Sequence, residues 1–148
     1  MLTPVEELLA VERIKQLKAR YFRTLDTKDW AGWGQVFTTD ATLTVDWAAG
    51  PDGRSTEPAA VGRASIVEFV KGKIAPATTV HHGHMPEIEI LSPTTARGVW
   101  AMEDIVETPE RSMNGHGHYH ETYRVEDGAW RIATLHLTRL RVVARTPA

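Results

Sequence analysis

The sequence predicts a single α+β domain, residues 1–148, in which an antiparallel sheet carries its helices on one face. The chain of 148 residues is 42% hydrophobic and 24% charged, a composition typical of one globular domain with one core. Helical periodicity and helix start signals occur only before Thr78, and from Thr78 onward the residues alternate as in strands. Because the helices precede a run of consecutive strands, separate layers of helix and sheet are favoured over alternating βα units.

The first predicted helix begins after Thr3 and extends to about Leu25. Thr3 is a suitable N-cap, Pro4 suits the first helical position, and Glu6 completes a capping box. The apolar residues then recur every three or four positions: Leu8, Val11, Ile14, Leu17, Tyr21 and Leu25. We expect this stripe to face the core, with four charged residues mostly off it: Glu12, Lys15, Lys18 and Arg20.

Shorter elements follow this helix. A break after Asp26 precedes a short second helix that reaches Phe37, in which aromatic residues have helical spacing. Alternating residues predict a first strand over 41–47, and the glycines and prolines of 49–60 predict a loop. A third helix is predicted over 65–74 from its apolar spacing. Four further strands are then expected, over residues 79–90, 95–107, 115–126 and 130–143.

The composition excludes several classes of protein. The chain has no cysteine, which excludes thiol catalysis and disulfide frameworks, and its net charge of −2 argues against nucleic-acid binding. No apolar run reaches about 18 residues, and acidic residues occupy the N-terminal region where a signal peptide would be basic and apolar. No nucleophile elbow or glycine-rich phosphate loop is present. We therefore expect a cytoplasmic protein without nucleic-acid or membrane partners.

A first group of candidate site residues consists of Tyr21, Asp26, His81 and Asp104. Asp104 alternates with Trp100 and Met102, so its carboxylate shares a strand face with two large apolar side chains. Burial there would oppose ionisation and suit a general acid. The alternatives are an ion pair with an arginine or a position in water near a strand end.

The stretch around His81 places an imidazole on each face of a strand, because His82 and His84 share one face and His81 takes the other. A histidine beside a carboxylate such as Asp26 is the usual form of a general base. The alternative for each of the three is a hydrogen-bonded core or edge histidine.

A second group of histidines, at 116, 118 and 120, lines one face of a later strand. Such spacing can bind a metal, but a solvated surface is the more common outcome, and we expect no metal. Tyr119 and Tyr123 take the opposite face, with Glu121 between them. On the last strand, either Arg139 or Arg141 could neutralise Asp104 or hold an anionic substrate.

The order of the elements and three motifs resemble the SnoaL-like branch of the nuclear transport factor two-like superfamily. The motifs are residues 25–30, which close the first helix, His81 at the start of the second strand, and residues 128–132 before the last. The resemblance covers nearly the whole chain. It implies a cone-shaped α+β barrel, whose curved sheet wraps around the N-terminal helices and a deep apolar pocket. It further implies no cofactor and a homodimer or homotrimer formed through the sheet.

Two dehydratases of that superfamily are especially similar. Asp26 and His81 match the orienting aspartate and the catalytic histidine of scytalone dehydratase. Tyr21 and Asp104 complete a match, in type and spacing, to the site of bile acid 7-alpha-dehydratase. The chain departs from both at residues 45–47, where a second tyrosine is missing, and near Val106, where scytalone dehydratase has a histidine.

The resemblance implies a dehydratase or isomerase acting on an apolar cyclic keto or hydroxy substrate, either steroid-like or polyketide-like. His81, oriented by Asp26, would remove a proton α to a carbonyl, Tyr21 would hydrogen-bond the enolate, and Asp104 would assist departure of a hydroxyl. The expected substrate-binding side chains are Trp47, Phe69, Trp100, Met102, Tyr119 and Arg141. The alternative is a non-catalytic binding or assembly module, with His81 and Asp104 paired to protein groups and no open cavity between them.

Overall fold

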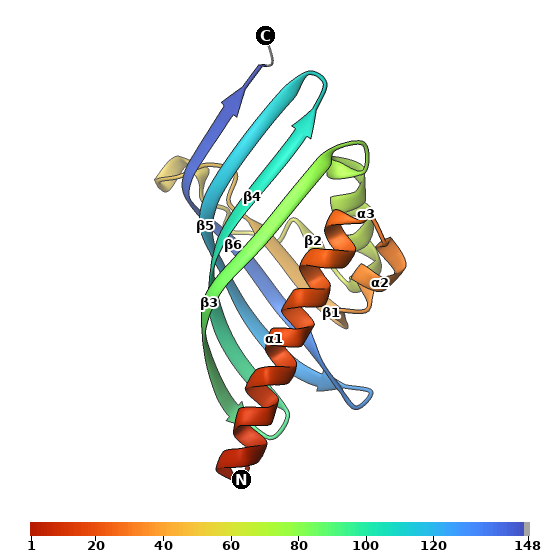
Figure 1. Ribbon diagram of the computed structural model, residues 1–148, viewed down its shortest axis with the longest axis vertical. Helices are drawn as coiled ribbons and strands as arrows, with labels where there is room; N and C mark the ends of the chain where they lie inside the picture. The colour runs from red at the N-terminus through yellow and green to blue at the C-terminus, as the bar shows by residue number, and fades with distance from the viewer. Residues whose placement is uncertain (147–148) are drawn as a thin grey trace.

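The computed structural model describes residues 1–146, and Figure 1 shows its helices on one side of a curved sheet. Among these residues the helices are α1 (Pro4–Asp26), α2 (Trp30–Gly34) and α3 (Arg63–Ile74), with a single 3-10 turn, η1 (Pro51–Gly53). The strands are β1 (Phe37–Val45), β2 (Ala60–Val61), β3 (Thr78–Ser92), β4 (Thr95–Thr108), β5 (Arg111–Glu126) and β6 (Ala129–Arg145). The α+β class predicted from the sequence is therefore confirmed.

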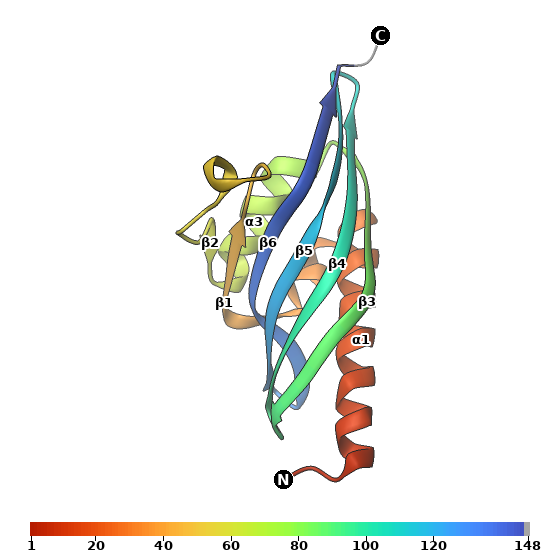
Figure 2. The same ribbon diagram turned by 90° about the vertical axis from the view of Figure 1, so that its left-hand side faces the viewer.

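The six strands form one curved sheet in the order β2-β1-β6-β5-β4-β3. The last four strands pair antiparallel as predicted, but β1 runs parallel to β6, so the sheet is mixed rather than purely antiparallel. The predicted barrel is also not closed, because β2 and β3 remain at opposite edges. Bulges in β3 and β6 bend the sheet around α1 (Figure 2). Alternation along β1 shows which side chains share a face, but it does not determine the partner or direction of the strand.

The first helix begins with the predicted capping box, in which the Thr3 hydroxyl accepts a hydrogen bond from the Glu6 backbone and the Glu6 carboxylate accepts one in return. Two predictions on its faces are wrong: Leu8 is 70% exposed, and Lys18 is completely buried. Three residues turn about 60° less than a full turn of the helix. Two such steps separate Leu8 from Ile14, so the Leu8 side chain points away from the face that Ile14 and Tyr21 share. Lys18 is only about 60° from Tyr21 around the helix, and it therefore faces the sheet.

The remaining differences lie at element boundaries. Phe37, predicted to end the second helix, begins β1, and the short helix α2 stops at Gly34. The predicted loop 49–60 contains η1 and ends at β2, which pairs with β1 through only two residues. A strand of this length has no periodicity that the sequence could reveal. Within residues 1–146, no helix combines the length and apolar character needed to cross a membrane.

The face of the sheet turned toward α1, called the inner face here, holds the core. Trp33 and Phe37 pack with Tyr21 of α1, and Tyr119 of β5 lies against the same ring. The opposite, outer face carries the polar alternates of the strands. This division places His81 and Asp104 on the inner face, on the side of α1 with its Tyr21 and Asp26, and most of the histidines on the outer face.

Candidate active site

The Asp26 carboxylate holds His81 through two hydrogen bonds. Asp26 is the last residue of α1, and its Oδ1 lies 2.7 Å from His81 Nδ1, while its Oδ2 accepts from the His81 backbone N–H at 2.8 Å. The Thr79 hydroxyl also donates to Asp26 Oδ1, at 2.9 Å, and receives a bond from Lys28 Nζ at 2.6 Å. The helix end thus fixes both the ring and the backbone of His81.

These contacts define the chemical state of the pair. Burial by itself raises the pKa of Asp26, but the hydrogen bonds from His81 and Thr79 outweigh burial, so that this pKa lies below its usual value. An ionised carboxylate only accepts hydrogen bonds, which makes Nδ1 the protonated nitrogen of a neutral His81 ring. In that neutral form the lone pair is on Nε2, and Nε2 makes no hydrogen bond within residues 1–146. This is the arrangement of a general base.

Asp104 pairs with an arginine, which was one of the alternatives left open by the sequence. Arg139 Nη1 and Nη2 donate to the two Asp104 carboxylate oxygens at 2.7 and 2.9 Å, and both side chains are less than 10% exposed. Asp104 is also the cross-strand partner of His81. Gly115 provides the space for the pair, because a Cβ there would overlap both charged groups. Arg139 Nε is buried and has no hydrogen-bond partner among residues 1–146.

The two candidate arginines take opposite faces of β6. Arg139 is opposite Gly117, whereas Arg141 is opposite His116, because a bulge at this point inserts Leu140. Arg141, expected to bind substrate, lies instead with Ser112 and Asn114 in the wall of a cavity of about 200 Å³ on the outer face. The bulge that decides between the two arginines has no signature in the sequence.

Three of the other expected substrate-binding residues surround the inner cluster. Tyr119, Trp100 and Met102 are buried, and Arg139 Nη1 lies 3.8 Å from the Met102 sulfur. Tyr21 is buried 5.8 Å from the Tyr119 ring, and burial strongly raises the pKa of both hydroxyls, which keeps them protonated.

The other two expected substrate-binding residues, Trp47 and Phe69, have neighbouring rings. Their rings are 6.3 Å apart, and Trp47 is 57% exposed. Trp47 follows the end of β1 and lies at the edge of the loop that contains η1. Trp47 is therefore exposed to solvent, whereas Phe69 is partly buried and packs against the core.

Sequence reasoning missed a second polar pair on the inner face. Lys18 Nζ forms an ion pair with Glu121 Oε1, and neither side chain is exposed. Tyr123 also donates to Glu121, at 2.5 Å. The position of Glu121 between Tyr119 and Tyr123 already indicated that its side chain points inward, and this was the signal that could have revealed the pair.

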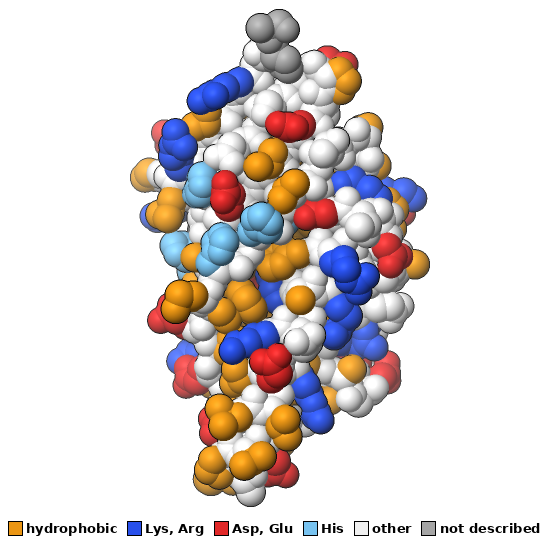
Figure 3. All heavy atoms as spheres, in the orientation of Figure 1, with side chains coloured by type: hydrophobic (Ala, Val, Ile, Leu, Met, Phe, Trp, Pro, Cys, Tyr) orange, Lys and Arg blue, Asp and Glu red, His pale blue; other side chains and the backbone are white. Residues whose placement is uncertain are grey.

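The outer face carries most of the histidines. His82, His84, His118 and His120 project there, and Figure 3 shows histidine side chains gathered on one part of the visible surface. His116 lies 3.6 Å from Glu103. In the part of the chain that the structure describes, no three His, Asp or Glu side chains are arranged to hold a metal ion.

The most prominent cavities lie outside the inner cluster. The largest, about 610 Å³, is on the outer face beside His120 and His136. None of the five most prominent cavities formed by residues 1–146 has the side chain of Tyr21, Asp26, His81 or Asp104 in its lining.

The chain matches the family model of the SnoaL-like domain over residues 6–136. It is 25% identical to Probable cyclase FGR4 of Gibberella zeae over 136 residues, which cover 86% of this chain and 89% of that protein. Two of the solved structures that share the fold illustrate the similarity. One is a scytalone dehydratase-like protein from Novosphingobium aromaticivorans, with a TM-score of 0.80 and 20% identity over 95% of this chain and 91% of that one. The other is a Delta 5-3-ketosteroid isomerase from Mycobacterium sp., with a TM-score of 0.61 and 20% identity over 84% and 91%.

Proposed function

Because the chain belongs to the SnoaL-like family, whose fold is shared by cyclases, dehydratases and isomerases, we propose that it is a cofactor-free lyase or isomerase. Its substrate would be an apolar cyclic ketone that also bears a hydroxyl or a double bond, such as a steroid-like or polyketide-like ring. Fold by itself does not determine activity, so the proposal rests on the inner cluster.

The observation that carries the proposal is the geometry of Asp26 and His81. Asp26 fixes Nδ1 as the protonated nitrogen and leaves Nε2 free, which is what removal of a proton α to a carbonyl requires. The buried Tyr21 hydroxyl would donate to the enolate oxygen that forms. In dehydration, the imidazolium of His81 would return the same proton to the β-hydroxyl, which leaves as water. In isomerisation, the proton would return to a different carbon.

The ion pair between Asp104 and Arg139 changes the role that the sequence indicated for Asp104. A carboxylate held by two guanidinium hydrogen bonds is a poor proton donor, so in the proposed mechanism Asp104 acts by positioning Arg139. The unpartnered Nε–H of Arg139 is a buried donor suited to a substrate oxygen. Arg139 thus replaces Arg141 as the arginine proposed to contact substrate.

A non-catalytic binding or assembly module is the second candidate. It is favoured by the full pairing of Asp104 and by the position of the prominent cavities away from His81. Under this alternative the sheet would serve to join copies of the chain as a homodimer or homotrimer. The two candidates differ in whether His81 moves a proton.

Proton exchange tests the proposal without knowledge of the true substrate. A panel of cyclic ketones, including β-hydroxy ketones, is incubated with the protein in D₂O, and loss of the α-proton signal is followed by NMR. The wild-type protein should accelerate exchange or elimination for at least one ketone, and His81→Gln should reduce the rate by about 10²–10⁴-fold. His82→Gln, whose side chain lies on the outer face, should keep the wild-type rate.

The outcomes separate the candidates. Exchange by the wild-type protein that persists unchanged in folded His81→Gln would refute the assigned base. Binding of a ketone without any exchange, in a protein with normal circular dichroism, would favour the non-catalytic module.

A further inference from the structure

Lys18 occupies an unusual position for a lysine. Its side chain is completely buried, and its Nζ lies 3.7 Å from the ring centroids of both Tyr21 and Tyr119. One ring comes from α1 and the other from β5, so the ammonium lies between the helix and the sheet. Cations above aromatic faces are attracted by the negative charge of the ring face, most strongly where water is excluded.

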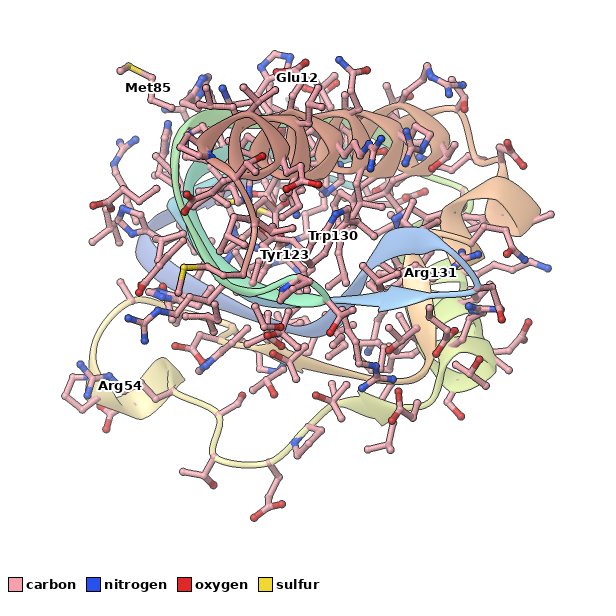
Figure 4. The ribbon with its side chains drawn as sticks, turned by 90° about the horizontal axis from the view of Figure 1, so that it is seen from below. Glu12, Arg54, Met85, Tyr123, Trp130 and Arg131 are labelled. Atoms are coloured by element: carbon pink, nitrogen blue, oxygen red, sulfur yellow. The ribbon has the colours of Figure 1, made fainter. Side chains whose placement is uncertain are left out.

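A continuous chain of hydrogen bonds holds this ammonium in place. Glu121 Oε1 binds Lys18, Glu121 Oε2 accepts from the Tyr123 hydroxyl at 2.5 Å, and Trp100 Nε1 donates to the same hydroxyl at 2.9 Å. Figure 4, seen from below, shows Tyr123 in the space between α1 and the sheet. Both oxygens of the buried carboxylate are therefore satisfied.

Stability alone does not account for this arrangement. Replacement of a buried ion pair by apolar residues of similar volume is often neutral or stabilising, because two charges must be taken out of water. Lys18 is also in direct contact with Tyr21, the proposed donor to the enolate. A fixed positive charge on the face of a phenol stabilises negative charge that develops on its oxygen, and this strengthens the hydroxyl as a hydrogen-bond donor.

We propose that Lys18 is a positioning residue of the site: its ammonium, held by Glu121, lies on the rings of Tyr21 and Tyr119 and strengthens the Tyr21 hydroxyl as a donor. The kinetic part of this inference rests on the proposed function. The effect of the Lys18 charge on the two rings does not rest on it, and it is measurable in the protein without a substrate.

The positive charge of Lys18 depends on pH. Burial lowers the pKa of Lys18 to about 8, although the charge and hydrogen bond of Glu121 oppose this change. The charge is therefore present below about pH 8 and lost above it. The other titratable groups around the ammonium are Tyr21 from α1 and Tyr119, Glu121 and Tyr123 from β5. Burial raises the pKa of all three hydroxyls, so they remain protonated over this range.

A spectroscopic experiment tests the effect on the rings directly. The chain has three tyrosines, so protein labelled with 3-fluorotyrosine should give three ¹⁹F signals, assigned by single Tyr→Phe variants. The Tyr21 and Tyr119 signals should move together with a midpoint near pH 8. The double variant Lys18→Met with Glu121→Gln leaves no unpaired buried charge, and it should lack this transition. Tyr21 and Tyr119 signals with the same chemical shifts at pH 7 in the wild-type protein and in the folded double variant, or a transition that persists in the double variant, would overturn the proposal.

A kinetic experiment then tests the catalytic consequence, on any ketone that the wild-type protein turns over. The double variant should lower kcat by about tenfold at pH 7, with little change in KM, and should lose the fall in kcat above about pH 8. Lys18→Arg keeps the cation and should retain more of kcat than Lys18→Met. Lys15→Met, an exposed change on the same helix, should leave kcat unchanged.

The two experiments distinguish failure of the inference from failure of the proposed function. A folded double variant that keeps the wild-type kcat, and the wild-type fall in kcat above about pH 8, would overturn the role of Lys18 while leaving His81 as the base. If the wild-type protein exchanges no ketone proton, the proposed function fails, and the ¹⁹F titration still decides whether Lys18 polarises the rings.

Discussion

Removal of the Asp104 charge is expected to destabilise the fold strongly. In Asp104→Asn, Arg139 would lose the carboxylate that receives both of its Nη hydrogen bonds, at 2.7 and 2.9 Å. The Arg139 side chain is only 7% exposed, and its Nε already has no hydrogen-bond partner among residues 1–146, so water cannot readily replace the lost charge. Breaking a buried pair by removing one partner costs about 3–5 kcal/mol. This is a large part of the stability of a typical domain.

Equilibrium unfolding in urea, followed by circular dichroism, measures this effect. With a slope of about 2 kcal/mol per molar urea, the midpoint of Asp104→Asn should fall by about 2 M. Glu89→Gln is the matched control, because Glu89 of β3 pairs with Arg97 of β4 in the same sheet, but both side chains are more than half exposed. That variant should change the free energy of unfolding by less than about 1 kcal/mol.

A double-mutant cycle identifies the cause of the loss. Adding Arg139→Gln to Asp104→Asn removes the unpaired charge, so the double variant should be markedly more stable than the sum of the two single changes predicts. Additive losses, or a loss in Asp104→Asn no larger than in the Glu89 control, would show that the ion pair is not electrostatically coupled as the geometry requires.

Three further predictions follow from single contacts. Gly115→Ala should destabilise the fold and shift the Asp104 carbonyl and carboxyl NMR signals, because a Cβ at that position overlaps the ion pair; an unperturbed spectrum would contradict the packing. Asp26→Asn should weaken the pH dependence of unfolding. The lowered pKa of Asp26 stabilises the fold at pH values above the ordinary aspartate pKa of about 3.9, and this stability is lost as the pH falls through the pKa of Asp26 in the folded protein. Equal urea midpoints for the variant and the wild type from pH 7 to 3 would refute this. Thr3→Ala removes the cap of α1 and should cost about 0.5–2 kcal/mol in urea unfolding, whereas no change would show that this end of the helix contributes nothing.

The sequence predicted the elements well where the local signal was long and regular. The α1 helix has a cap, a proline at its start and six apolar residues at helical spacing, and the last four strands alternate over many residues with turn residues between them. The two-residue strand β2 and the early start of β1 carry no such pattern. Asp26 and His81 were identified as a pair from their types and from the family resemblance, and the structure places them in contact.

The partners of the other inner-face residues could not be predicted. Alternation along β4 placed Asp104 on the apolar face, but its neighbour on that face depends on the bulge in β6 that brings Arg139 inward and turns Arg141 outward. The helical pattern placed Lys18 off the stripe that faces the core, and only the approach of β5 showed that Lys18 is buried against Glu121.

The sequence by itself determined the α+β class, the order of the elements other than β2, the family and the residues of the proposed base. Only the tertiary structure decided that β1 runs parallel to β6, that Asp104 is held by Arg139, and that Lys18 is buried between two tyrosine rings. The physical reason is that local periodicity specifies the face of an element on which a side chain lies. The group that meets it comes from elements distant in the chain, and their register and curvature depend on the packing of the whole domain.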